Sequence, residues 1–240
     1  MKIEDISRQA IQAQPVVNTK YSLYRGFSPA DVGFPGFGPA IYRHGLKRVA
    51  DLAITILALP LLVPIIAALA FLVMLDGHSP FYSQKRLGKN GRIYRMWKLR
   101  SMVHNADAAL EEILARDPKA RAEWTVSQKL RNDPRITTVG RILRRFSLDE
   151  LPQFFNVITG DMSLVGPRPM MPEQASLYPG HAYYALRPGL TGPWQVSARN
   201  ESTFAERAEY DDLYVRGLCF KADLKLIFGT VVVMFRGTGH

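Results

Sequence analysis

The chain has 240 residues, 47% of them hydrophobic and 22% charged, a balance typical of a folded protein and not of a disordered one. Its formal net charge of +10 favours anionic partners: nucleic acid, acidic lipid or phosphorylated substrates. Cys219 is the single cysteine, so a disulfide within the chain is excluded, and the spacing of the five histidines makes a zinc site improbable.

The first 40 residues contain no apolar core of the signal-peptide type. Residues 26–39 are rich in glycine and proline and follow neither a helical nor a strand period. We therefore predict that residues 1–40 form an irregular N-terminal arm, which either lies on the surface through its phenylalanines or is disordered.

An uncharged apolar segment of 24 residues runs from Leu52 to Leu75. As a straight helix it would be about 36 Å long, enough to cross the about 30 Å hydrocarbon core of a bilayer. A helix of a soluble protein seldom runs this far without a polar face. Pro60 and Pro64, near the middle, should kink it. The pattern predicts a membrane-inserted helix within residues 41–78.

Basic residues flank this segment on both sides. Because Lys and Arg near an apolar segment prefer the cytoplasmic side, both ends are predicted to remain there. The segment would then be a bent re-entrant helical hairpin that penetrates about one leaflet; a kinked single span is the alternative. In either case the rest of the chain, residues 79–240, is predicted to be a catalytic domain on the cytoplasmic face. The flanking residues are Arg43, Lys47 and Arg48 before the segment, and Lys85, Arg86, Lys89, Arg92, Arg95, Lys98 and Arg100 after it.

The remainder predicts an α+β, helix-rich fold with a small β element. A basic hairpin is expected over residues 79–99, around a turn at Gly88–Gly91. Residues 160–200 are loop-rich. Helices are predicted over residues 104–117, 137–145, 151–159, about 203–215 and about 223–235.

The string RILRRFSLDELPQ (141–153) carries the strongest candidate for chemistry. Ser147 and Glu150 have the spacing of a capping box, and Pro152 favours an early helical position, so Asp149 and Glu150 are predicted at a helix N-terminus. Either these acids merely cap the helix and pair with Arg144 and Arg145, or Asp149 acts as a carboxylate nucleophile on phosphorus.

Further polar residues could bind phosphate, nucleotide or sugar. Arg168 lies between two prolines that hold its backbone rigidly, as bidentate phosphate binding requires, although a stiff turn is the simpler interpretation. Lys98 and Arg100 could contact substrate phosphate or lipid headgroups. Candidates for reading a base, ribose or sugar are Gln195, Arg199 and Asn200.

Taken together, these strings resemble the bacterial sugar transferase family, the monotopic polyprenyl-phosphate phosphoglycosyl transferases. The resemblance runs in order from about Lys47 to about Phe235. It is carried by KRVADL, the proline-broken apolar run, KLRSM, NDPRITTVGRILRRFSLDELPQ, GDMSLVGPRP and RPGLTGPWQVSARN. Two positions depart from the family pattern: Val63 stands where a serine is frequent, and Ala198 replaces a glycine.

The resemblance implies an active site at the cytoplasmic face of the cell inner membrane, Mg²⁺ as cofactor, and a ping-pong reaction through a phosphosugar–enzyme intermediate. Asp149 would be the nucleophile and Glu150 its acidic partner, and both are candidate Mg²⁺ ligands. The residues expected to bind substrate phosphate are Arg144, Arg145, Arg168, Lys98 and Arg100; those expected to bind nucleotide or sugar are Gln195, Arg199 and Asn200.

The predicted activity is transfer of a sugar-1-phosphate from a UDP-sugar to polyprenyl (undecaprenyl) phosphate, with release of UMP, as the first membrane step of exopolysaccharide biosynthesis. Galactose or glucose is the expected sugar. One rival is a non-catalytic, basic, membrane-associated scaffold or regulator. A nucleic-acid-binding protein is the other, but it leaves the apolar segment without a purpose, so no nucleic acid is expected as a partner. A homo-oligomer is left open.

Overall fold

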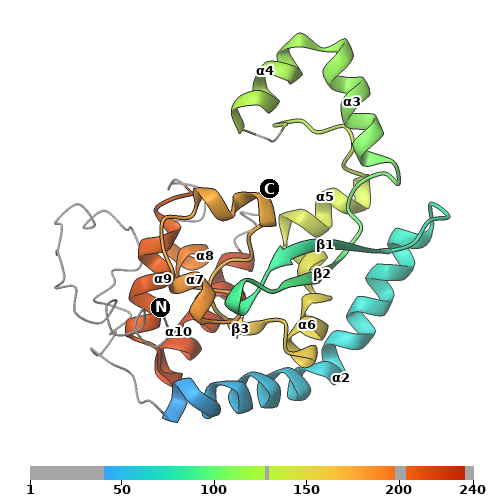
Figure 1. Ribbon diagram of the computed structural model, residues 1–240. Coiled ribbons are helices and arrows are strands. Elements are labelled where there is room, and N and C mark those ends of the chain that lie inside the picture. Colours follow the sequence, from blue (N-terminus) through green and yellow to red (C-terminus); the bar gives the residue numbers. More distant parts are fainter. Residues whose placement is uncertain (1–40, 128–129, 198–203, 236–240) are drawn as a thin grey trace.

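The computed structural model describes residues 41–127, 130–197 and 204–235, so the predicted arm at 1–40 lies outside the described residues. Within the described part, helices dominate and strands form two small two-stranded sheets. This agrees with the predicted helix-rich fold with a small β element. In Figure 1 a long bent helix runs along the outside of a body of shorter helices and strands, and a pair of helices projects from the body.

The apolar segment forms helix α2 (Lys47–Met74), which follows a π-helical turn, η2 (Tyr42–Leu46). The backbone stays helical through Pro60 and Pro64, but the helix is bent: its first part lies along the base of the body and its second part climbs the side (Figure 1). The structure thus has one continuous bent helix, in keeping with the kink that the two prolines predict.

The buried residues of α2 lie toward its two ends, and its middle is less covered. The buried residues are Lys47, Asp51 and Thr55 in the first part and Ile66, Ala70 and Val73 in the second. Positions 56–65, which include both prolines, are all half-buried or exposed. The part of α2 that protrudes from the body is therefore its proline-containing middle.

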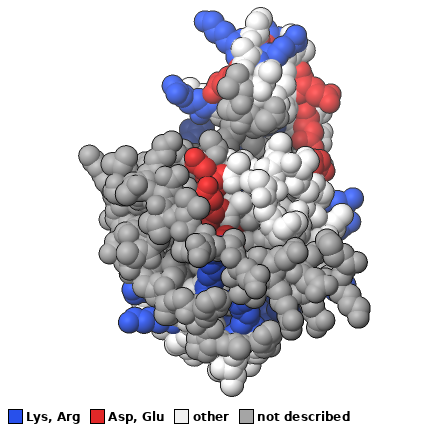
Figure 2. Space-filling view, turned by 60° about the vertical axis from the view of Figure 1, so that its left-hand side comes forward, with Lys and Arg blue, Asp and Glu red and all other residues white. Residues whose placement is uncertain are grey.

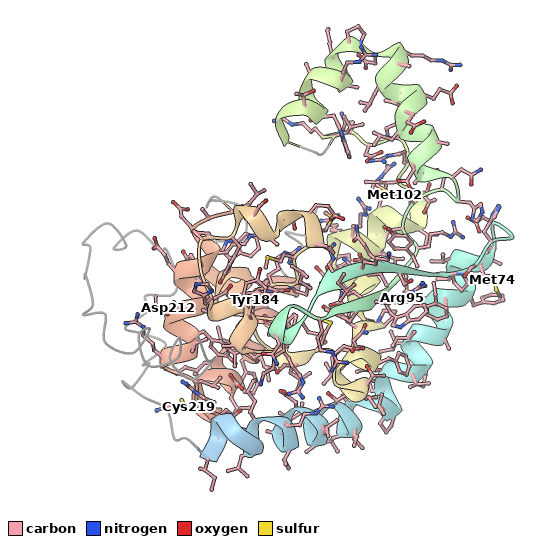
Figure 3. All side chains as sticks on the ribbon, viewed as in Figure 1. Met74, Arg95, Met102, Tyr184, Asp212 and Cys219 are labelled. Carbon is pink, nitrogen blue, oxygen red and sulfur yellow. The ribbon has the colours of Figure 1, made fainter. Side chains whose placement is uncertain are left out.

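A buried polar cluster holds the first end of α2. The Lys47 ammonium lies 2.7 Å from the carboxylate of Asp223 on α10 (Phe220–Phe235), and Tyr42 donates a 2.7 Å hydrogen bond to the same carboxylate. Ser163, on β3 (Ser163–Val165), donates a 2.6 Å hydrogen bond to Asp51. In Figure 3, Cys219 marks this end of the helix and Met74 the other.

The predicted β-hairpin is confirmed. Strands β1 (Phe81–Leu87) and β2 (Ile93–Leu99) pair antiparallel with Phe81 opposite Leu99. A 3-10 turn, η3 (Lys89–Gly91), joins them, and its Asn90 and Gly91 have φ of 59° and 74°. Asparagine and glycine tolerate this left-handed conformation better than other residues, which is why the turn forms here.

The predicted helices are also present, with shifted ends. They are α3 (Ala106–Arg116), α5 (Thr138–Arg145), α6 (Gln153–Thr159), α9 (Arg207–Arg216) and α10. The sequence analysis missed α4 (Pro118–Ser127), which with α3 forms the projecting pair in Figure 1. Figure 2 shows both acidic and basic side chains on this projection, so it is not a uniformly basic surface.

The segment predicted as loop-rich contains a second sheet. Strand β3 pairs in parallel with β4 (Gly189–Thr191), and Ser163 lies opposite Gly189. The chain between them forms η5 (Pro172–Leu177) and α7 (Ala182–Ala185), and α8 (Pro193–Ser197) follows β4. Strands of 3 residues are too short to show an alternating pattern, which is why they were missed.

Candidate active site

Asp149 and Glu150 lie in a 3-10 turn, η4 (Leu148–Glu150), between α5 and α6. Ser147, before this turn, has a left-handed backbone with φ of 55°. Its backbone carbonyl accepts a 3.2 Å hydrogen bond from the Glu150 amide, in place of the predicted side-chain cap. The predicted capping box is therefore wrong, and α6 begins only at Gln153.

The two acids share one cation, which comes from the hairpin. Lys98 on β2 places its ammonium 2.8 Å from a Glu150 carboxylate oxygen and 3.7 Å from one of Asp149. The Asp149 side chain is buried, whereas that of Glu150 is half-buried. Burial raises the pKa of Asp149, and the repulsion of Glu150 adds to this; Lys98 and, more weakly, Arg144 oppose it. Burial therefore outweighs the cations in its effect on the pKa of Asp149.

The two arginines predicted to face the acids have different positions. Arg144 acts on Asp149 electrostatically and donates a 2.8 Å hydrogen bond to Ser101. The helix can approach Ser101 because Gly140 lies against it: a Cβ at position 140 would be 1.9 Å from the Ser101 carbonyl oxygen. Arg145 is exposed and lies over the ring of Phe146. Only Arg144 joins the site.

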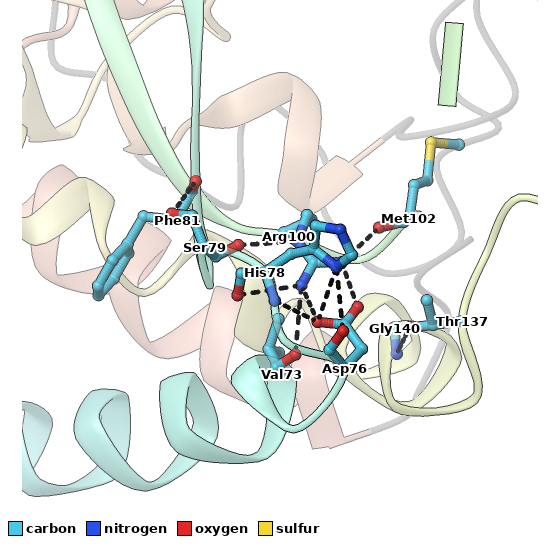
Figure 4. Close-up of polar contacts among 9 residues, drawn as sticks. All are labelled: Val73, Asp76, His78, Ser79, Phe81, Arg100, Met102, Thr137 and Gly140. Atoms are coloured by element: carbon cyan, nitrogen blue, oxygen red, sulfur yellow. Dashed lines mark hydrogen bonds and ion pairs between the residues drawn. The ribbon is translucent and has the colours of Figure 1, made fainter. Parts of the chain in front are cut away.

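Arg100 has a structural position instead of the predicted phosphate contact (Figure 4). Its guanidinium makes two 2.6 Å hydrogen bonds to the carboxylate of Asp76, just beyond the end of α2. These bonds hold the pKa of Asp76 at about 2. Further donors reach the carbonyls of Ser79 at 2.8 Å and Met102 at 3.1 Å. Arg100 therefore fixes the second end of α2 to the end of β2, and its donors are occupied.

Arg168 belongs to a cluster of three guanidinium groups, with Arg86 and Arg207. Arg168 and Arg207 lie 5.4 and 4.2 Å from the centre of the Trp194 ring. Burial, followed by repulsion from Arg168, lowers the pKa of Arg86 and lowers that of Arg207 to about 10. The Nε atoms of Arg86 and Arg207 are buried without a hydrogen-bond partner among the described residues. Such a cluster is suited to an anion with several oxygens.

Arg86 and Arg207 were not recognised as site residues from the sequence. Arg86 was grouped with the basic flank of the apolar segment, and Arg207 carries no motif that marks it. The signal that could have drawn attention to Arg86 is its place at an inward position of the predicted hairpin.

Gln195 on α8 lies in the same cavity wall as Arg168. Both polar atoms of its amide are buried without a hydrogen-bond partner in the described part of the chain. Gln195 lines a cavity together with Ser147, Glu150 and Arg168. Arg199 and Asn200 lie outside the described residues. The structure thus brings Asp149, Glu150, Lys98, Arg144, Arg168 and Gln195 together, whereas the contacts of Arg100 and Arg145 are with other residues.

Among the described residues, the donors for a metal ion at this site are the two acids, Asp149 and Glu150. Within the described ranges, three His, Cys, Asp or Glu side chains nowhere gather as a ready-made site. A carboxylate pair beside a cluster of cations is the donor set of an ion that takes its other ligands from phosphate and water, as Mg²⁺ does. The residues present therefore fit such an ion.

An acidic pair beside a lysine and near an arginine cluster is an arrangement suited to binding phosphorylated groups. The chain belongs to the bacterial sugar transferase family, whose model matches residues 42–237. This confirms the family predicted from the sequence motifs.

Within this family, the chain is similar to several proteins whose names give an activity. The chain is 44% identical over 196 residues to a UDP-galactose-lipid carrier transferase of Erwinia amylovora; the match covers 81% of this chain and 41% of that protein. It is 44% identical over 197 residues to the exopolysaccharide production protein ExoY of Sinorhizobium fredii, covering 80% of this chain and 87% of that protein. It is 37% identical over 197 residues to a UDP-glucose:undecaprenyl-phosphate glucose-1-phosphate transferase of Escherichia coli, covering 78% and 39%.

The chain therefore spans about two fifths of the length of the Erwinia and Escherichia relatives and most of the length of ExoY. The names agree with the predicted class of enzyme, a phosphoglycosyl transferase.

Proposed function

We propose that this protein transfers a sugar-1-phosphate, of glucose or galactose, from a UDP-sugar to polyprenyl (undecaprenyl) phosphate at the cytoplasmic face of the inner membrane, in exopolysaccharide biosynthesis. The observation that carries the proposal is the position of Asp149, a buried carboxylate under Lys98 and beside the cavity that Glu150, Arg168 and Gln195 line. The names of the relatives support the two substrates.

In the first step an Asp149 carboxylate oxygen attacks the β-phosphorus of the UDP-sugar. A P–O bond to Asp149 forms, and the bond from the β-phosphorus to the bridging oxygen breaks, so that UMP leaves with that electron pair. The arginine cluster of Arg86, Arg168 and Arg207 is suited to hold the diphosphate. Lys98 offsets the charge of the acids as the anionic donor approaches.

In the second step an oxygen of the lipid phosphate attacks the same phosphorus. The P–O bond to Asp149 breaks, the carboxylate is regenerated, and the sugar leaves on a lipid diphosphate. Because Asp149 carries the phosphosugar between the steps, UMP is released before the lipid reacts, as in other covalent catalysis with ping-pong kinetics.

Mg²⁺ is proposed as cofactor, with Glu150 and Asp149 as its protein ligands. When bound, it would neutralise charge on the phosphate oxygens of the donor. Glu150 is the better placed of the two, because it is half-buried and faces the cavity, whereas Asp149 is buried.

The proposed membrane contact is the middle of α2. Among the described residues α2 is the one helix long and apolar enough to cross a membrane, and 17% of its apolar stretch is buried. Leu57 and Leu61 are 83% and 68% exposed. Both ends of α2 are tied to the same body, through Lys47–Asp223 and Asp76–Arg100, which favours the re-entrant arrangement over a single span.

The test is the variant Asp149→Asn, with Asp212→Asn on the surface of α9 as the matched control. With radiolabelled UDP-glucose or UDP-galactose and undecaprenyl phosphate, Asp149→Asn should release no UMP and trap no labelled phosphosugar, and Asp212→Asn should behave as wild type. Full turnover by Asp149→Asn would refute the proposal. A scaffold or regulator, the rival function, would bind lipid vesicles but release no UMP even as wild type.

A further inference from the structure

A cavity of about 240 Å³ begins at the candidate active site and extends between helices. Its walls come from α2, α6, β3, β4, α8 and α10, together with Ser147 and Glu150 before α6. Pockets that enclose a drug-sized ligand have volumes of about 300–1,000 Å³, so this cavity is smaller. The cavity therefore fits a short segment of a molecule.

The two parts of the cavity have different chemistry. Near the acids its wall is polar, with Glu150, the Arg168 guanidinium and the Gln195 amide. The amide atoms of Gln195 are buried and have no hydrogen-bond partner in the described structure, so this end contains an unsatisfied polar group. The rest of the lining is apolar apart from Ser147, Thr191 and Thr230, and its apolar residues include Ile54, Ala58, Leu164, Ile227 and Val231.

The apolar part lies against the two helices that expose apolar side chains. Ile54 and Ala58 are on the inward side of α2, whose outward Leu57 is 83% exposed. Val231, on α10, lines the cavity and is itself 45% exposed, and the nearby Phe228 is 68% exposed. An apolar chain that enters at the polar end could thus continue to the surface that the proposed function places in lipid.

A UDP-sugar does not match a cavity with a few polar and many apolar lining residues, because its base, ribose, phosphates and sugar are all polar. Burial of any of these against the apolar wall would leave polar groups without partners. An amphiphile with an anionic head and a long hydrocarbon chain does match.

We propose that the cavity is the acceptor site for the lipid phosphate: it holds the isoprene units next to the phosphate, with the phosphate at Arg168 and Gln195 beside Glu150. The rest of the chain leaves between α2 and α10. This inference rests on the proposed function for the identity of the lipid. Arg168 then stands between two anions, the donor diphosphate on its arginine-cluster side and the acceptor phosphate on its cavity side.

Binding can be tested without any UDP-sugar. A farnesyl phosphate with a diazirine on its first isoprene unit is irradiated with wild-type protein in nanodiscs, and the labelled peptides are identified by mass spectrometry. The expected label falls on the segments with Ile54 and Ala58 and with Ile227 and Val231, and undecaprenyl phosphate competes for it. Label elsewhere, or equal competition by phosphatidic acid of ordinary acyl chains, would overturn the proposal.

A pair of adjacent substitutions on α2 tests the role in the reaction. Ala58→Trp fills the cavity, and Leu57→Trp, one residue away and outward, is the control. Ala58→Trp should release UMP in a single-turnover burst within twofold of wild type, and transfer to undecaprenyl phosphate at least tenfold more slowly. Leu57→Trp should retain both steps. A normal transfer rate, or loss of the burst from a folded Ala58→Trp protein, would contradict the assignment.

Two controls distinguish misfolding from loss of lipid binding, and failure of this inference from failure of the proposed function. Circular dichroism melts establish that Ala58→Trp is folded, and Ile227→Trp, which fills the same cavity from α10, replaces it if it is not. If the wild-type protein releases no UMP, the proposed function fails, whereas the labelling experiment still decides whether the cavity binds a lipid phosphate.

Discussion

The ammonium of Lys98 lies 2.8 Å from a carboxylate oxygen of Glu150, a residue 52 positions away in the chain. This contact joins the hairpin strand β2 to the turn η4, and it places the same ammonium 3.7 Å from Asp149. The charge environment of the acidic pair therefore depends on the hairpin, and not only on residues close to the pair in sequence. Among the described residues, the cation nearest to the candidate nucleophile is a lysine, although the sequence drew attention to arginines.

Substitution of Lys98 should move the pH dependence of the first step. Asp149 must be ionised to attack, and Lys98 lowers its pKa, so Lys98→Met raises that pKa further. The acid limb of the rate of UMP release should move to higher pH, and at a pH on that limb the rate should fall about tenfold for each unit that the limb moves. The measurement is a single-turnover pH profile. Lys85→Met, on the exposed side of β1, is the control, and an unmoved acid limb in Lys98→Met would contradict the assigned role.

Alanine substitution of the neighbouring residues Arg144 and Arg145 should have very different effects on kcat/KM. Arg144→Ala removes a cation that acts on Asp149 and a hydrogen bond to Ser101, so kcat/KM for UDP-sugar should fall about 10–100-fold, as expected for a charged hydrogen bond. Arg145→Ala removes an exposed side chain and should change kcat/KM less than twofold. Steady-state UMP release measures both. Equal losses in the two variants would contradict the different roles assigned to the two arginines.

Arg100→Ala should lower the thermal stability of the protein without weakening substrate binding. The guanidinium links Asp76 to the carbonyls around the end of α2, and its removal leaves buried acceptors without donors. The Tm should fall by about 5 °C or more, whereas KM for UDP-sugar of the folded protein should stay within twofold. Arg95→Ala, an exposed position of the same strand, is the control. A raised KM with an unchanged Tm would favour the original prediction of a phosphate contact.

Asp211 should make the stability depend on pH. It is buried under the Tyr178 hydroxyl, which donates a 2.8 Å hydrogen bond to it, and burial raises its pKa from 3.8 to about 7. The folded state therefore holds this proton longer than the unfolded state, so the stabilisation is complete below pH 3.8 and is lost as the pH rises to about 7.

Relative to Asp211→Asn, the wild type should lose free energy of unfolding over this range, by about 4 kcal/mol at most. Urea denaturation at pH 4, 5.5, 7 and 8 measures the difference between the two proteins. Asp212→Asn, at the half-buried neighbouring position, should show no such trend. A constant difference between wild type and Asp211→Asn would mean that Asp211 titrates as in the unfolded chain.

Sequence patterns predicted much of the fold but less of the site. The hairpin and the longer helices follow from periodicity and turn residues, which are local. Strands β3 and β4 were missed because each depends on a partner distant in the chain. The capping box was wrong because Ser147 takes a left-handed backbone, which its spacing to Glu150 does not reveal.

The sequence by itself determined the apolar helix, its two prolines, the acidic pair and the family, because these depend on residues adjacent in the chain. Only the tertiary structure decided that Lys98 faces Asp149, that Arg100 fixes α2, that Arg86 and Arg207 join Arg168, and that an apolar cavity opens beside the acids. Charge and burial act through space, and a linear pattern does not contain the distances between side chains that folding brings together.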